Sequence, residues 1–201
     1  IATAARSRLA PDARVVAITG SAGKTGTTAM MRAALTTTAK THAPEKSFNN
    51  HWGVPLTLAR MPADSAFGVF EIGMNHADEI RPLVKLVRPH VAIITNVLPV
   101  HVGNFPDGET GVANAKAEIL EGLPSGSGVA VLPRDNPHFD LLAAKAKELG
   151  VKIMTFGLSA SAEVRPKSLR VAPDHSIVEL ADNTAYRLTT PGEHIAVNSL
   201  A

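Results

Sequence analysis

VVAITGSAGKT, at residues 15–25, combines the features from which the fold of this chain can be inferred. Its first four residues are apolar and are followed by turn residues, which predicts a buried β-strand over Val15–Ile18. A glycine-containing loop follows from Gly20 to Gly26, and the apolar spacing from Thr27 to about Lys40 is helical. A buried strand, a tight loop and a helix in this order form the context that a phosphate-binding loop requires.

The chemistry of this loop suits a nucleoside triphosphate. Glycine at positions 20 and 23 lets the backbone turn tightly and bring its N–H groups close to phosphate oxygens. The N-terminus of the following helix favours negative charge. The ammonium group of Lys24 can reach the β- and γ-phosphates, and the hydroxyl of Thr25 can ligate the Mg²⁺ that bridges them. The loop residues that we expect to bind the nucleotide are Gly20, Ser21, Ala22, Gly23, Lys24 and Thr25.

One position departs from the general phosphate-loop pattern G-x-x-x-x-G-K-[ST]. That pattern would place its first glycine at position 18, which is Ile18 here, so the loop is the shorter G-x-x-G-K-T. The alternative is a glycine-rich strand–helix turn with a chance Gly-Lys-Thr. Because strand, loop and helix agree, we favour the phosphate loop, which by itself does not choose between an NTPase, a kinase and a ligase.

The rest of the chain alternates apolar strands with helices, which predicts an α/β fold with a mostly parallel phosphate-loop NTPase-like sheet and helices on both faces. Residues 163–190 alternate polar and apolar positions without a helix. They predict three short antiparallel strands, either an edge extension of the sheet or a small satellite sheet. Further strands are expected at residues 66–72, 91–95, 129–132 and 151–156, and helices at 2–9, 78–87, 109–123, 139–149 and, as a first turn, 198–200.

Composition excludes several classes of protein. The chain has no cysteine, which excludes disulfides and thiolate metal sites. Its 20 cationic and 18 anionic residues are nearly balanced and form no basic stripe for a nucleic acid. No apolar run approaches the roughly 18 residues of a membrane helix, and no signal peptide is visible. We therefore expect a cytoplasmic protein that does not insert into a membrane.

Three further side chains are candidates for the site. Glu71 ends a predicted parallel strand, at the edge where such sheets bind ligands, and could hold Mg²⁺ or simply face solvent. Asn96 and His101 follow the next strand, and the histidine could ligate a metal, orient a substrate or cap its loop. Lys116 lies on a predicted helix, where the residues alone favour a surface lysine, unpaired or paired with Glu109 or Glu118.

Taken together, six segments of the chain resemble the central domain of the Mur ligases. Their order and spacing agree with that family from about residue 12 to the end of the chain. The segments are Thr19–Thr25, Asn49–Leu58, Glu71–His76, Ile94–Val97 with His101, Ala115–Ile119, and Pro191–His194 with Asn198. The second and third of them are most similar to the member that adds D-alanyl-D-alanine to UDP-N-acetylmuramoyl-tripeptide.

The resemblance implies a three-domain ATP-dependent amide ligase of peptidoglycan synthesis that works through an acyl phosphate. Residues 1–12 would be the end of a linker helix from an N-terminal domain that holds the UDP-sugar, and residues 13–201 the ATP-binding domain. A C-terminal domain that closes over the nucleotide would lie outside this sequence. The implied partners are ATP, UDP-N-acetylmuramoyl-tripeptide and D-alanyl-D-alanine, and we expect a monomer that binds no nucleic acid.

The resemblance also implies roles for individual residues. The lysine that matches Lys116 is carbamylated in this family and would hold a second Mg²⁺ with Glu71 and His101, while Thr25 would hold the first. The residues expected to act in catalysis are therefore Lys24, Lys116 and His101. His194 and Asn198 match positions that contact adenosine, and Asn49 and Asn50 match a segment near the substrate. Gly26 stands where relatives carry Ser or Thr, which excludes a side-chain contact to the nucleotide there.

Two alternatives remain at this point. One is a different enzyme, either another Mur ligase or a ligase of the folylpolyglutamate synthase type, which shares the loop and the mechanism. The other is an ATP-binding module that catalyses no ligation in this isolated fragment, which we expect to turn over poorly alone.

Overall fold

The computed structural model describes all residues from 1 to 201 and contains two separate sheets. The larger sheet has six strands, all parallel, in the order β2-β3-β1-β4-β5-β6. This confirms the predicted α/β class and each of the five strands that the apolar runs indicated. The strands are β1 Arg14–Thr19, β2 Thr41–His42, β3 Phe67–Glu71, β4 Val91–Ile94, β5 Val129–Pro133 and β6 Lys152–Phe156.

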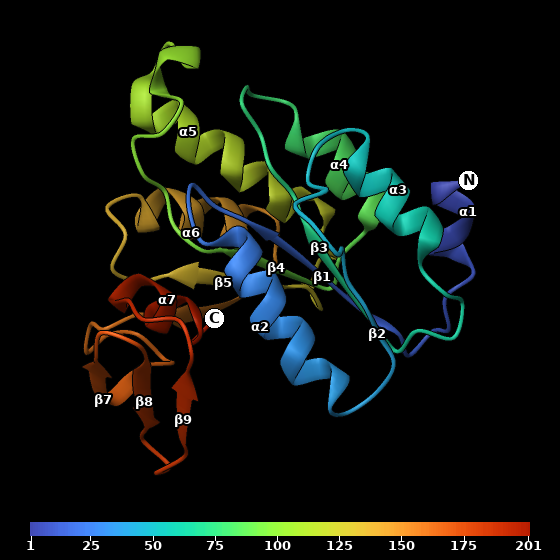
Figure 1. Cartoon of the computed structure of the whole chain (residues 1–201). Helices are drawn as coiled ribbons and strands as arrows, with labels where there is room; N and C mark the ends of the chain where they lie inside the picture. Colours follow the sequence, from blue (N-terminus) through green and yellow to red (C-terminus); the bar gives the residue numbers. More distant parts are fainter.

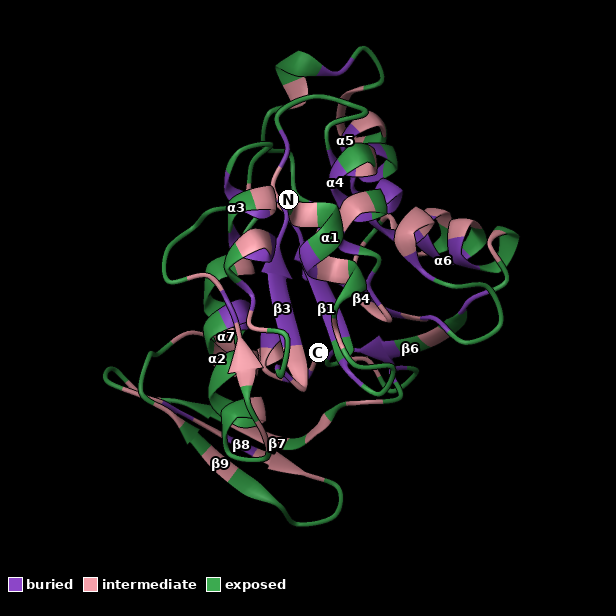
Figure 2. Ribbon diagram, turned by 90° about the vertical axis from the view of Figure 1, so that its right-hand side faces the viewer, coloured by how far each residue is buried: buried purple, intermediate pink, exposed green.

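The central strands are buried on both faces because their apolar side chains alternate between two cores. In β1, Val15 and Ala17 belong to one core and Val16 and Ile18 to the other. Figure 2 shows β1 and β3 in the buried interior, with helices to either side. A continuous run of small and branched apolar residues, rather than an alternating one, is therefore what a central parallel strand needs.

Helices cover both faces of this sheet, as predicted (Figure 1). The helices α1 Ala2–Ser7, α3 Gly53–Arg60, α4 Ile80–Val87, α5 Gly108–Ala117 and α6 Phe139–Glu148 pack on one face. The helices α2 Lys24–Thr36 and α7 Glu193–Asn198 pack on the other. Two short 3₁₀ segments, η1 Val102–Asn104 and η2 Glu118–Gly122, complete the set. None of these helices has both the length and the apolar composition needed to cross a bilayer.

The second sheet is antiparallel and consists of β7 Pro166–Val171, β8 Ser176–Leu180 and β9 Ala185–Leu188. It is a satellite sheet rather than an edge extension, because only an isolated bridge between Phe156 and Val164 connects this part of the chain to β6. Val178 of β8 packs into the same core as Ala196 of α7 and Leu200, which follows α7. The small sheet and α7 therefore form one layer on the α2 side (Figure 1).

Several predicted boundaries were wrong. The helix after the loop begins at Lys24, three residues before the predicted Thr27, and ends at Thr36, in a run of three threonines that are poor helix formers. The helix predicted to start at Asn198 instead ends there, because the Pro191-Gly192 break lets α7 begin at Glu193. The single helix expected over 109–123 is α5 followed by η2, and three elements, β2, α3 and η1, were not predicted at all.

Candidate nucleotide and substrate site

The strand order brings three predicted site segments to one edge of the sheet. β1 lies between β3 and β4, so the carboxyl ends of these three strands are neighbours. Glu71 stands opposite Ile18 in the register of β1 and β3, and Thr95 follows directly on β4. The loop that begins at Gly20 therefore runs between Glu71 on one side and the residues after β4 on the other.

The loop is held from the β4 side by Thr95 and Asn96. The backbone amides of Ser21 and Ala22 donate to the carbonyl and side-chain oxygens of Asn96, at 3.1 and 2.9 Å. The hydroxyl of Thr95 donates to the carbonyl of Ala22 at 2.7 Å. A Cβ atom at Gly20 would overlap the Thr95 hydroxyl, so only glycine allows this approach. In the sequence analysis both residues belonged to a segment that resembles the Mur ligases, but neither was given a role in holding the loop.

The next four backbone amides, from Gly23 to Gly26, have no acceptor within the loop or helix. They are the first N–H groups of α2, the orphan donors that every helix N-terminus presents. Gly23 has a φ of 84°, which directs this turn and which a residue with a side chain rarely adopts. The geometry therefore leaves a set of adjacent donors at the positive end of a helix, which suits a phosphate group.

Glu71 is oriented by two neighbours and not by solvent. It is only 2% exposed, and its carboxylate accepts from the Thr25 hydroxyl at 2.9 Å and from the side-chain amide of Asn49 at 2.6 Å. This excludes the alternative that Glu71 faces solvent. The ammonium of Lys24 donates to the Gly20 carbonyl at 2.7 Å, and burial lowers its pKa while the Glu71 carboxylate opposes that change.

Lys116 is buried, contrary to what its residue type suggested. The residue is 4% exposed, and its side chain forms neither of the two ion pairs considered. The carboxylate of Glu109 lies 3.1 Å from the ring nitrogen Nε2 of His138, and the carboxylate of Glu118 accepts from backbone amides just before and within α4. The pKa of Lys116 is lowered to about 7, mainly by burial and to a smaller extent by the positive charge of Lys24. Near pH 7 a substantial fraction of Lys116 is therefore the neutral amine.

A cavity of about 550 Å³ opens beside the phosphate loop. It brings together the predicted residues Lys24, Asn49, Asn50 and His101. Further lining residues are His51, Asn75, Asp78 and Glu79. His101 is exposed and has a left-handed backbone at the start of η1. On the other side of the loop, Asn198 of α7 is buried and so close to Gly23 that a Cβ there would overlap its side-chain amide. His194, on the first turn of α7, is exposed.

Comparison with known proteins assigns this arrangement to a family. The sequence matches the family described as the Mur ligase middle domain over residues 18–201. The chain belongs to the Mur ligase family. This confirms the resemblance that the six sequence segments indicated.

The most similar relatives include two curated ligases and a crystal structure. UDP-N-acetylmuramoyl-tripeptide–D-alanyl-D-alanine ligases from Bacillus subtilis and Escherichia coli are 34% and 35% identical, over 94% of this chain and 40% and 42% of their own lengths. A crystal structure of MurF from Acinetobacter baumannii superposes with a TM-score of 0.90 and 31% identity, over 99% of this chain and 43% of that one. The chain thus spans about two fifths of the length of these relatives.

The metal site expected for a Mur ligase is not complete in the unmodified side chains. No group of three or more His, Cys, Asp or Glu residues lies close enough together to hold a metal ion. Of the predicted set, Thr25 and Glu71 are hydrogen-bonded to each other, and His101 lies in the cavity that Lys24 lines. Glu71 is the only anion among them, so a further anionic ligand would have to come from the nucleotide or from a modified lysine.

Proposed function

We propose that this chain is the ATP-binding middle domain of a ligase that joins D-alanyl-D-alanine to UDP-N-acetylmuramoyl-tripeptide. The observation that carries the proposal is the helix N-terminus at residues 23–26, whose backbone amides have no acceptor and which has Lys24 and Glu71 beside it. The chain is a Mur ligase, and its curated relatives from Bacillus subtilis and Escherichia coli are named for that activity. In this proposal the protein acts in the cytoplasmic synthesis of the cell-wall precursor.

The phosphate loop is the proposed site of the ATP phosphates. The amides of residues 23–26 would donate to phosphate oxygens, and Lys24 would neutralise part of their charge. His194 and Asn198 are the proposed adenosine contacts. Their support is that Asn198 packs directly on Gly23, so α7 lies at the edge of the loop.

Mg²⁺ fits the residues at this edge. The Thr25 hydroxyl and the Glu71 carboxylate are oxygen donors of the kind that Mg²⁺ prefers, and each is held by the other. We propose that Thr25 ligates one ion, and that Glu71, His101 and a carbamylated Lys116 ligate a second. When bound, the ions would withdraw charge from the phosphate oxygens.

The environment of Lys116 supports its proposed carbamylation. A buried amine with a pKa of about 7 is present in substantial part as the free base near neutral pH, the form that attacks CO₂. Its nitrogen would bond to the carbon of CO₂ and release a proton, which leaves an anionic carbamate. The carbamate would place an anion near the Lys24 cation, whereas a protonated Lys116 would be repelled by it.

The chain would then bring two anions together for reaction. The muramoyl-tripeptide carboxylate attacks the γ-phosphate to give an acyl phosphate and ADP, and the amine of D-alanyl-D-alanine then displaces phosphate. Two like charges 4 Å apart repel by about 4 kcal/mol at an effective dielectric constant near 20. Lys24 lines both the loop and the cavity, so it can offset this repulsion, and Asn49 and Asn50 are proposed to contact the peptide.

The proposal is tested with the full-length protein by measuring ATP-dependent ligation and phosphate release. UDP-N-acetylmuramoyl-tripeptide with D-alanyl-D-alanine should be used, whereas folate with glutamate should not. Lys24→Ala should reduce the rate to below a few per cent of wild type, while Lys152→Ala, on the distant strand β6, serves as the matched control. Use of folate would favour the folylpolyglutamate synthase type, and ATP binding without product would favour a binding module.

A test of the carbamate uses Lys116→Ala. This variant should be inactive and should regain part of its activity when short carboxylic acids, such as formate or acetate, are added to occupy the place of the carbamate. Full activity of Lys116→Ala without any addition would refute the role of the lysine.

A further inference from the structure

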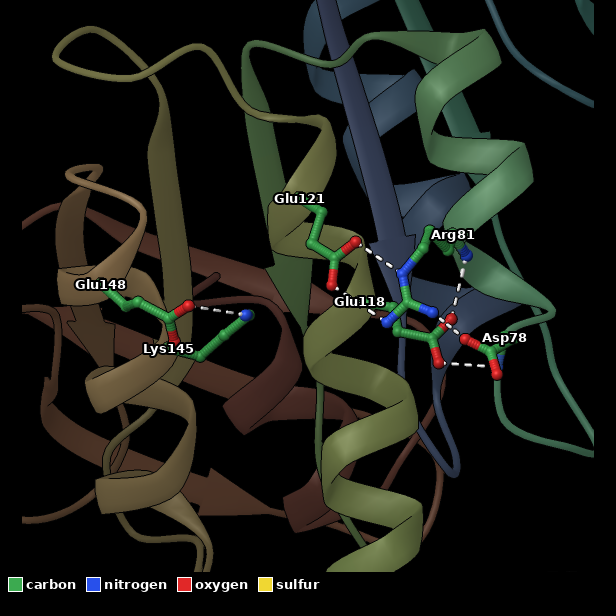
Figure 3. A network of polar contacts seen from close by, with 6 residues as sticks. All are labelled: Asp78, Arg81, Glu118, Glu121, Lys145 and Glu148. Carbon is green, nitrogen blue, oxygen red and sulfur yellow. Dashed lines mark hydrogen bonds and ion pairs between the residues drawn. The ribbon is translucent and has the colours of Figure 1, made fainter.

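The wall of the substrate cavity is held by a residue from another element. Glu118, at the junction of α5 and η2, is 4% exposed, and its two carboxylate oxygens accept the backbone amides of Asp78 at 2.7 Å and Arg81 at 3.0 Å (Figure 3). The helix α4 has no side-chain cap from its own N-cap residue, Glu79. Glu118 therefore caps the first turn of α4 from across the fold, with a negative charge at the positive end of the helix.

A second contact fastens the same two elements. The guanidinium of Arg81 donates to both carboxylate oxygens of Glu121, at 2.7 and 3.1 Å, and also pairs with Asp78 (Figure 3). Both glutamates lie on η2 and bind the start of α4: Glu118 accepts from backbone amides, and Glu121 accepts from the side chain of Arg81.

The segment held in this way is part of the cavity. Asn75, Asp78 and Glu79 line it together with Lys24 and His101. Asp78 has a φ of 65°, a left-handed conformation that costs a residue with a side chain about 1 kcal/mol or more. The hydrogen bond from its amide to Glu118 offsets that cost. Without it, the start of α4 would lose its cap and the amide of the strained Asp78 would lose its acceptor.

The same glutamate stands two residues from Lys116 on a continuous helical segment. The positive charge of Lys24, in the phosphate loop, lowers the pKa of Lys116, whereas Glu118 contacts the start of α4. Glu118 makes no hydrogen bond to the phosphate loop or to α7. Its position thus connects the backbone that carries Lys116 to the cavity wall, and not to the nucleotide side of the site.

We infer that Glu118 is a positioning residue for the peptide-bearing substrate: it fixes the cavity wall at residues 75–79 relative to Lys116. The inference rests on the proposed ligase function and goes beyond it, because it separates recognition of the muramoyl-peptide from recognition of ATP. Loss of the Glu118 contacts should weaken use of the muramoyl-peptide and leave use of ATP unchanged.

The test compares Glu118→Gln, Glu118→Ala and Glu148→Gln in the full-length protein. Glutamine keeps one acceptor but turns an NH₂ group toward a backbone N–H, and alanine removes both acceptors. The KM for UDP-N-acetylmuramoyl-tripeptide should rise about ten-fold in Glu118→Gln and further in Glu118→Ala, as expected for one and two lost charge-assisted hydrogen bonds. The KM for ATP should change less than two-fold. Glu148, on α6, pairs with Lys145 without contacting α4, so Glu148→Gln should match wild type (Figure 3).

Urea unfolding and hydrogen exchange complete the experiment. Amide protection at residues 75–81 should fall in Glu118→Gln while the phosphate-loop amides keep theirs, and both variants should unfold cooperatively. An unchanged KM for the tripeptide, or a parallel rise in both KM values, would overturn the inference and leave the ligase function standing. A wild-type protein without ligase activity would instead overturn the proposed function, and this inference with it.

Discussion

Replacing Lys116 by methionine should stabilise the protein in the absence of CO₂ and metal ions. Methionine has a similar length and no charge, so it removes the unfavourable burial of an ammonium group. The lowering of the Lys116 pKa from 10.5 to about 7 corresponds to up to about 5 kcal/mol, at 1.36 kcal/mol per pKa unit. The full-length variant should at the same time lose ligase activity, because it has no amine to carbamylate.

The direction of the pH dependence follows from proton linkage. Because the folded pKa of Lys116 lies below the unfolded value, the unfolded chain binds more protons between about pH 7 and pH 10.5. The contribution of Lys116 to the free energy of unfolding of the wild type therefore increases as the pH rises through that window, because removing its proton on folding costs less at higher pH. Below about pH 7 the lysine is protonated in both states and its full penalty applies.

The measurement is urea unfolding of wild type and Lys116→Met from pH 6 to pH 10, in CO₂-free buffer with EDTA. The difference between the two proteins cancels the titration of every other group. The advantage of the variant should be largest at pH 6 and should shrink steadily toward pH 10. A variant less stable than wild type at pH 6, or a difference independent of pH, would refute the assigned environment of Lys116.

Three substitutions around the phosphate loop have distinct expected outcomes. Gly26→Ala should stabilise the protein by about 0.5–1 kcal/mol in thermal unfolding, because Gly26 lies within α2 and its Cβ would meet no atom. Gly23→Ala should destabilise the protein by at least about 1–2 kcal/mol and weaken ATP binding measured by calorimetry. The reasons are the left-handed backbone at position 23 and the overlap of the new Cβ with the side chain of Asn198. A variant as stable as wild type would contradict the loop geometry. Asn49→Ala should raise the Mg²⁺ concentration needed for activity about ten-fold by releasing Glu71, and an unchanged Mg²⁺ requirement would show that Asn49 does not orient this carboxylate.

Most of the sheet was predictable because its strands are buried on both faces. Runs such as Val15–Ile18 and Val91–Ile94 consist only of apolar residues, and this composition alone predicts a buried strand. The strand β2, in contrast, has only two residues at the edge of the sheet and leaves no pattern. The helix α3 begins with Gly53 and has Pro55 in its first turn, where proline is tolerated but does not signal a helix.

The candidate site was predictable where it depends on strand order and unpredictable where it depends on packing between helices. Glu71 and Thr25 could be expected to meet, because Glu71 ends β3 and Thr25 lies on the helix that opens after the loop following β1, at the same edge of the sheet. The burial of Lys116 could not, since α5 has buried residues around much of its circumference near its C-terminal end, including Ala113, Ala115 and Ala117. Alanines at these positions allow close packing on several sides without marking one apolar face.

The buried lysine and the strained cavity wall have a common explanation in the packing of one helical segment. Lys116 is unfavourable for folding in its protonated form, and the left-handed Asp78 is unfavourable in any form, so neither would persist without support from its surroundings. That support comes from opposite sides of the same turn of chain, since apolar packing encloses Lys116 while Glu118 binds the amide of Asp78. Because both supports come from one turn of chain, their contributions to the free energy of unfolding are coupled. Stability measured with Lys116→Met and Glu118→Ala, singly and combined, should accordingly be non-additive, as it is for residues that share one structural element.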